Sequence, residues 1–204
     1  MKNKILITLS VLSLLPMTSF AYLSNAIECT RHTLSTYTLD TPHWYVAGNL
    51  GVSHLYDVQT PHLAASVDEN GPGWDASVGY QWNSILGGEL GYTQYYNSRE
   101  TAGIVLIART SHFAVHLNAT ARYPLAYQLS VLGKLGIAYS YAQKIYQATN
   151  VAISSGAASP YLGLGLDYSI TPRTDLIGQW AFVRGNNFTG SSVLYSLGVA
   201  FAIA

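Results

Sequence analysis

The sequence predicts an all-β protein, an eight-stranded antiparallel up-and-down transmembrane β-barrel. Successive segments alternate between apolar and polar residues, which is typical of strands with one apolar face. Charged residues make up only 10% of the chain, against about 25% in ordinary soluble domains. The connections between segments also alternate between long and tight. Half of a soluble antiparallel barrel or sandwich is the alternative that this pattern leaves open.

Residues 74–96 show the pattern most clearly and predict a β-hairpin around residues 83–85. Trp74, Val78 and Trp82 share one face with Ala76 and Tyr80, while the opposite face is small or polar. In the second half, Leu90 and its apolar neighbours oppose Glu89 and glycines. This pattern suits the wall of a barrel in lipid, which has large apolar residues outside, small polar residues inside and aromatic residues near the strand ends.

Six further segments continue this alternation along the chain. They cover residues 44–53, a part of 104–123, 128–141, 161–170, 176–182 and 193–203. Long or polar connections are expected at 57–73, from Asn97 onward, at 143–158 and at 185–191, and tight turns at 83–85, 123–126 and 171–173. An even strand count with this alternation places the tight turns and both ends of the barrel on the periplasmic side.

Backbone hydrogen bonding then requires the strands to close into a barrel, because unpaired N–H and C=O groups are too costly in hydrocarbon. Eight strands give an interior that side chains can fill, so no open pore is implied. The inward-facing positions carry a few ionisable or amide side chains, which are Glu89, His116, Arg122, Lys134, Asp167 and Gln179. Buried charges need partners, so we expect these residues to form a polar network in the lumen.

The N-terminus has the features of a secretory signal peptide. Lys2 and Lys4 precede an apolar run, and Ser19-Phe20-Ala21 offers small residues for a signal peptidase. We expect domains at 1–21 (signal peptide), 22–42 (periplasmic lead-in) and 43–204 (barrel), with cleavage after Ala26 as the alternative. An uncleaved anchor is disfavoured because the apolar run is too short to span a bilayer. The expected location is the outer membrane of a Gram-negative cell.

Composition argues against several kinds of site. Cys29 is the single cysteine, so neither an internal disulfide nor a thiolate metal site is expected. The formal net charge is zero, with no basic cluster for nucleic acid. His112 and His116 could be proposed with Ser111 and Glu100 for nucleophilic catalysis, but Ser111 lies on the outward phase and both histidines on the inward phase. We therefore expect no enzyme activity, no metal and no cofactor.

Several short motifs occur in an order that is typical of one family. These are His43-Trp44-Tyr45, Gly79-Tyr80-Gln81, Gly91-Tyr92, Tyr123-Pro124, the segment 167–172 and Ser196-Leu197-Gly198-Val199. Over about residues 43–203 the chain resembles the eight-stranded transmembrane domain of the outer membrane protein A family. The resemblance implies charged lumen residues that pair across the barrel.

Three lumen positions match that family pattern. Lys134 and Asp167 match a basic–acidic pair, which predicts an ion pair between them. Glu89 matches an acid that bonds to basic residues, but the matching basic positions hold Thr120 and Ile177, so Arg122 and Lys134 are its alternative partners.

The family often continues into a peptidoglycan-binding domain, whereas this sequence stops after the expected barrel. It ends Phe201-Ala202-Ile203-Ala204 rather than on an aromatic residue, so Tyr195 and Phe201 are expected to serve recognition by the barrel-assembly machinery. Peptidoglycan tethering is therefore not expected.

The functional expectation is a structural or surface-interaction role, with adhesin- or receptor-like loops at 57–73 and 143–158. The expected partners are outer-membrane lipid, lipopolysaccharide and the assembly machinery, with a host-surface or phage ligand at the loops and no nucleic acid. The lumen network is interpreted as a structural plug, with an ion path as the alternative. A small ion channel or porin, a lipid A-modifying enzyme and a soluble lipocalin-like carrier remain as alternative functions.

Overall fold

The computed structural model describes residues 41–56, 66–147, 151–185 and 189–203. These residues form β strands and no helix. The strands are β1 (His43–Tyr56), β2 (Ser66–Asp68), β3 (Asn70–Gln81), β4 (Leu86–Gln94), β5 (Ser98–Ala102), β6 (Val105–Ala126), β7 (Leu129–Tyr146), β8 (Val151–Thr171), β9 (Thr174–Val183) and β10 (Ser191–Ile203). No described helix is long and apolar enough to cross a membrane.

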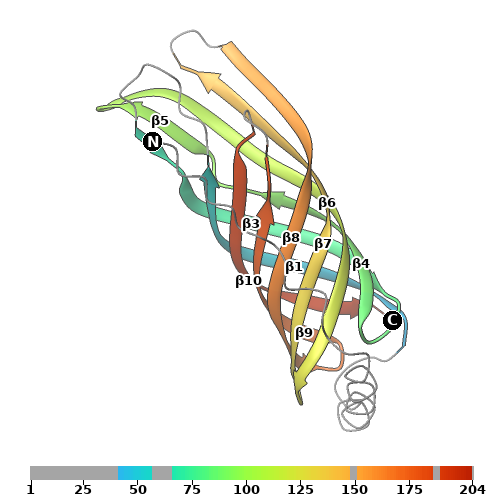
Figure 1. The fold of residues 1–204 in the computed structure, drawn as a ribbon. Helices are drawn as coiled ribbons and strands as arrows, with labels where there is room; N and C mark the ends of the chain where they lie inside the picture. The colour runs from blue at the N-terminus through green and yellow to red at the C-terminus, as the bar shows by residue number, and fades with distance from the viewer. Residues whose placement is uncertain (1–40, 57–65, 148–150, 186–188, 204) are drawn as a thin grey trace, which may run out of the picture.

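Eight of these strands close into a ring (Figure 1). The order around it is β6-β4-β3-β1-β10-β9-β8-β7, and pairing of β7 with β6 completes the circle. Every neighbouring pair is antiparallel. The predicted eight-stranded antiparallel barrel is thereby confirmed, and its closure pairs the backbone groups that hydrocarbon could not solvate.

Side chains alternate between the two sides of the wall as predicted. On β1, Asn49 is 2% exposed and the following Leu50 is 73% exposed. The same contrast separates Thr120 from Leu117 on β6. Apolar residues outside and polar residues inside are the reverse of a soluble core, so the outer surface of this barrel suits lipid.

Aromatic side chains gather toward the two ends of the apolar surface. Toward the long connections, Tyr92 lies 5.4 Å from Trp74 and 5.6 Å from Phe113, which is 5.0 Å from Tyr141, measured between ring centroids. Near the tight turns, the Trp44 and Tyr80 rings lie 5.0 Å apart. Aromatic belts of this kind occupy the headgroup layers on each side of a membrane.

Strand lengths differ sharply around the barrel. β4 and β9 have 9 and 10 residues, whereas β6, β7 and β8 have 22, 18 and 21. About 9–11 residues suffice to cross the hydrocarbon. The three long strands therefore continue past the barrel on the side of the long connections, as Figure 1 shows.

We call this extension the outer sheet. It consists of β2, β5, residues 105–112 of β6, residues 142–146 of β7 and residues 151–160 of β8. β5 pairs with β6 beyond the end of β4, and β2 pairs with β5. A positive φ of 62° at Gly103, which glycine adopts without strain, lets the chain turn between β5 and β6.

The outer sheet corrects three expectations from the sequence. The loop expected at 57–73 contains β2 and the start of β3, the connection from Asn97 contains β5, and most of the loop expected at 143–158 belongs to β7 and β8. The segment 104–123, of which only a part was predicted to be a strand, belongs to β6 from Val105 onward. Alternation fails as a signal at the tip of β8, where residues 151–154 are all exposed and both sides of the strand meet water.

The expected signal peptide with its cleavage sites, and the lead-in except for residues 41–42, lie outside the described residues, as do Cys29 and Ala204.

Candidate functional site

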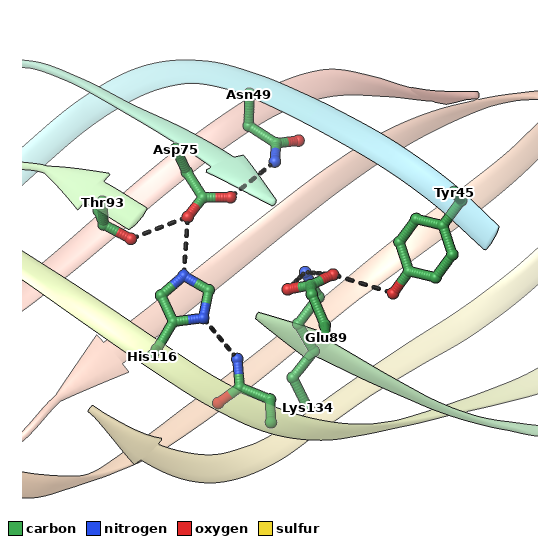
Figure 2. Close-up of polar contacts among 8 residues, drawn as sticks. Tyr45, Asn49, Asp75, Glu89, Thr93, His116 and Lys134 are labelled. Carbon is green, nitrogen blue, oxygen red and sulfur yellow. Dashed lines mark hydrogen bonds and ion pairs between the residues drawn. The ribbon is translucent and has the colours of Figure 1, made fainter. Parts of the chain in front are cut away.

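An ion pair between Glu89 and Lys134 lies in the middle of the barrel interior (Figure 2). Lys134 Nζ donates to Glu89 Oε1 at 2.8 Å and to Oε2 at 2.9 Å. The Tyr45 hydroxyl donates to the same Oε2 at 3.1 Å. All three residues are buried. Such an ion pair with added hydrogen bonds is the arrangement in which two opposite charges tolerate removal from water.

A second cluster is built around Asp75, which comes from β3. Its Oδ1 accepts a hydrogen bond from Asn49 Nδ2 at 3.0 Å, and its Oδ2 accepts one from Thr93 Oγ1 at 2.8 Å (Figure 2). His116 Nε2 lies 3.0 Å from the same Oδ2. Asn118 Nδ2 lies 2.8 Å from the other ring nitrogen of His116. An amide donor there fixes the imidazole proton on Nε2, from which it is donated to Asp75.

A third cluster lies nearer the tight turns. Arg122 Nη1 on β6 donates to Asp175 Oδ2 at 3.0 Å and forms an ion pair at 3.1 Å with Asp167 Oδ2. Its guanidinium also lies over the Tyr45 ring, 5.6 Å from the centroid. Tyr45 thus contacts both the Glu89–Lys134 pair and the Arg122 cluster.

The predicted ion pair between Lys134 and Asp167 is wrong. Although their strands are neighbours, Lys134 lies opposite Gly163 and Asp167 lies opposite Ser130, so the two residues are offset along the ladder. Lys134 instead pairs with Glu89 and Asp167 with Arg122. Of the two alternative partners for Glu89, the structure selects Lys134. The register of neighbouring strands, which the sequence does not state, decides both pairings.

All six predicted lumen residues face inward, but they are not one connected network. Gln179 is buried, and its side-chain amide makes no hydrogen bond with the described residues. Sequence reasoning missed the roles of Asp75, Tyr45 and Asp175. Asp75 was on the predicted inward face. The register of the predicted hairpin, which places Asp75 opposite Thr93, could have indicated their contact.

Inward glycines make room for the large lumen side chains. A Cβ atom at Gly79 would run into the Tyr45 ring, and one at Gly91 would run into the His116 ring. Outward-facing Gly48, in contrast, has open space around it. The inward glycines therefore determine where Tyr45 and His116 can lie.

Apolar side chains cover the polar clusters toward both ends of the barrel. On the outer side, Tyr161 stacks on His116 with ring centroids 4.6 Å apart. It belongs to a buried cluster of Leu55, Tyr95, Ala114, Ala138, Tyr161, Ala181, Val183 and Leu194. Toward the tight turns, a second cluster consists of Tyr45, Ala47, Leu132, Ile177 and Ala200. The interior is consequently packed with side chains, as expected for eight strands.

In the part of the chain that the structure describes, the Asp75–His116 pair does not hold a hydroxyl nucleophile. Asp75 could orient His116 as a base. A hydroxyl nucleophile would then have to contact His116 Nδ1, but the Asn118 amide already contacts that nitrogen. His112 is buried, while the adjacent Ser111 lies on the opposite side of β6. Within the described ranges, no group of three His, Cys, Asp or Glu side chains could hold a metal ion.

Comparisons with known proteins agree with this geometry. Outer membrane protein A of Salmonella typhi is 30% identical over 177 residues, which cover 78% of this chain and 47% of that protein. The Escherichia coli O157:H7 protein of the same name is 28% identical over 164 residues, covering 78% and 47%. The chain thus spans about half the length of these curated relatives.

Solved structures share the fold at low sequence identity. OprG of Pseudomonas aeruginosa matches with a TM-score of 0.58 at 12% identity, covering 83% of this chain and 99% of that one. Ail of Yersinia pestis matches with a TM-score of 0.55 at 14% identity, covering 81% and 100%. The protein is an integral β-barrel of the outer membrane. Residues 40–187 match the model of the OmpA-like transmembrane domain, and the chain therefore belongs to this family.

Proposed function

We propose that this protein is an outer-membrane anchor that holds the outer sheet at the cell surface for interaction with an external partner. The observation that carries the proposal is the length of β6, β7 and β8, which have 22, 18 and 21 residues where about half would cross the membrane. Strand pairing between β6, β7 and β8 continues along the extension, so the outer sheet is a hydrogen-bonded continuation of the barrel wall.

The packed interior supports anchoring over ion conduction. The charges of Glu89 and Lys134 neutralise each other, and the His116 ring is stacked under Tyr161. An ion crossing the barrel would have to displace these side chains and the apolar clusters on either side of them. The polar clusters thus act as a structural plug that gives the barrel a single packed state.

The outer sheet offers a free edge to a partner. Among the described residues, β9 pairs with β8 only from Tyr161 downward, so residues 151–159 of β8 pair with β7 alone. An edge of unpaired N–H and C=O groups can accept an added strand from another protein. Ail of Yersinia pestis, which shares this fold, was solved in complex with the heparin analogue sucrose octasulfate. Both observations support an external ligand as the partner of the outer sheet.

Shortening the outer sheet tests the proposal. Lys144 and Ile153 are opposite each other, as are Gln143 and Ser154. Replacing residues 144–153 with Asn-Gly would therefore join β7 and β8 by a tight turn without changing the register. The shortened barrel should still shift on boiling in denaturing gels. Cells that express the wild type should adhere to cultured epithelial cells or to heparin-coated surfaces, and cells that express the shortened barrel should not.

A lumen variant supplies the matched control. The double variant Glu89→Gln with Lys134→Met keeps the outer sheet and should adhere like the wild type. Adherence that survives shortening, or that depends on the lumen variant, would contradict the proposal. A channel would instead give wild-type conductance in planar bilayers that changes in Lys134→Ala, and a lipid A-modifying enzyme would change the mass of lipid A from expressing cells.

A further inference from the structure

Two arginines face each other on the outside of the outer sheet. Arg99 on β5 lies directly opposite Arg109 on β6, and both side chains are exposed. Directly opposed residues on antiparallel strands have Cβ atoms about 5 Å apart, where two like charges destabilise the pair. Neither arginine forms an ion pair with a described residue. A site with this unfavourable charge arrangement is suited to an anion from outside the chain.

The nearby carboxylates leave this pair of arginines with a net positive charge. Glu100, next to Arg99, is buried on the other side of β5 and forms an ion pair with Lys144 at 2.7 Å. Asp68 lies opposite Arg99 on β2, and its Oδ2 accepts a hydrogen bond from the Tyr96 hydroxyl at 3.2 Å. This row of the outer sheet therefore carries two cations and one acid, and the residues directly opposite Arg109 are Arg99 and Ile145, neither of which is an acid.

The height of the pair follows from the rows of outward-facing residues on β6 and β7. Phe113 and Tyr141 are opposite each other in the aromatic belt. The next outward row holds Ser111 opposite Gln143, and the row after that holds Arg109 opposite Ile145. Successive rows are about 7 Å apart along a strand. The aromatic belt marks the headgroup boundary. When the tilt of the strands is included, the two arginines lie about 10 Å farther from the membrane centre than this belt does.

We infer that Arg99 and Arg109 bind the phosphate groups of lipid A in the outer leaflet. The three rows match the order of groups in such a lipid: acyl chains beside the aromatic belt, sugar hydroxyls beside Ser111 and Gln143, and phosphates beside the arginines. Guanidinium groups bind phosphate oxygens through paired, charge-assisted hydrogen bonds. The bound lipid would remove the repulsion between the two arginines and tie the outer sheet to the membrane surface.

The test uses the full barrel in phosphatidylcholine nanodiscs, with lipid A or dephosphorylated lipid A added. Lipid A should raise the unfolding temperature of the wild type, and dephosphorylated lipid A should do so much less. Arg99→Gln with Arg109→Gln should weaken lipid A binding by about tenfold or more, as expected for lost hydrogen bonds to a charged group. Arg184→Gln, which changes an exposed arginine after β9, should bind like the wild type.

Three outcomes would overturn the inference. Equal binding of both lipids would show that the phosphates are not recognised. Unchanged binding by the double variant, with the boiling shift retained as evidence of folding, would place the lipid elsewhere. If inorganic phosphate or sucrose octasulfate alone binds through these arginines more tightly than lipid A does, the site serves a soluble anion.

Discussion

Lys134 donates hydrogen bonds to both carboxylate oxygens of Glu89, although β6 separates their strands in the barrel wall. The contact is diagonal across β6, because Glu89 lies opposite Asn118 while Lys134 lies opposite Thr120. A long, flexible ammonium side chain can reach across that offset. The pair ties β4 to β7 inside the barrel, where neither charge has access to bulk water.

Lys134→Met should therefore destabilise the barrel more than the loss of one favourable contact would suggest. Removing one partner leaves the Glu89 carboxylate buried without its counter-charge, which costs about 3–5 kcal/mol. Adding Glu89→Gln should recover a large part of that loss, because no unpaired charge then remains. Urea unfolding in lipid vesicles of the wild type, both single variants and the double variant measures the coupling. Additive single effects would show that the two residues do not act as a pair.

Thr93→Val should weaken the cluster around Asp75. The substitution keeps the shape of the side chain but removes the hydroxyl that donates to Asp75 Oδ2 at 2.8 Å. A hydrogen bond to a charged group contributes about 1.5–3 kcal/mol to the free energy of unfolding. Ser77→Ala is the control, since this buried hydroxyl makes no hydrogen bond within the described chain. Comparable losses in the two variants would argue against a special role for Asp75.

Much of the barrel could be predicted from the sequence because lipid and lumen impose opposite demands on adjacent residues. The inward positions of His116 and Asp167 follow from that alternation alone. Their partners do not, because eight strands direct charges into one narrow space and only the register shows which of them meet. The outer sheet was missed for a related reason. Both sides of residues 151–154 meet water, and the buried side of β5 carries the polar residues Ser98 and Glu100, so neither stretch has an apolar period.

Gly91→Ala should be more damaging than its small volume suggests. The added methyl group would run into the His116 ring, which is held between Asp75 and the stacked Tyr161. Overpacking of a tightly packed interior costs about 1–3 kcal/mol. Gly48→Ala adds the same group to the outward side, where it meets open space, and should be neutral or slightly stabilising. Refolding yield into vesicles, followed by the boiling shift, would distinguish the two variants.

Leu117→Arg tests which surface faces lipid. Leu117 is 57% exposed on β6, four residues from the aromatic belt at Phe113 and six from Tyr123 near the tight turn, so it lies close to the bilayer midplane. Arginine at that depth costs about 2–4 kcal/mol in a membrane barrel. Val105→Arg, on the same strand but in the outer sheet and 63% exposed, should cost almost nothing because it meets water. The free energy of unfolding in vesicles should therefore fall much more in Leu117→Arg than in Val105→Arg, although the two positions are similarly exposed. Equal losses in both variants would place Leu117 in water rather than in lipid.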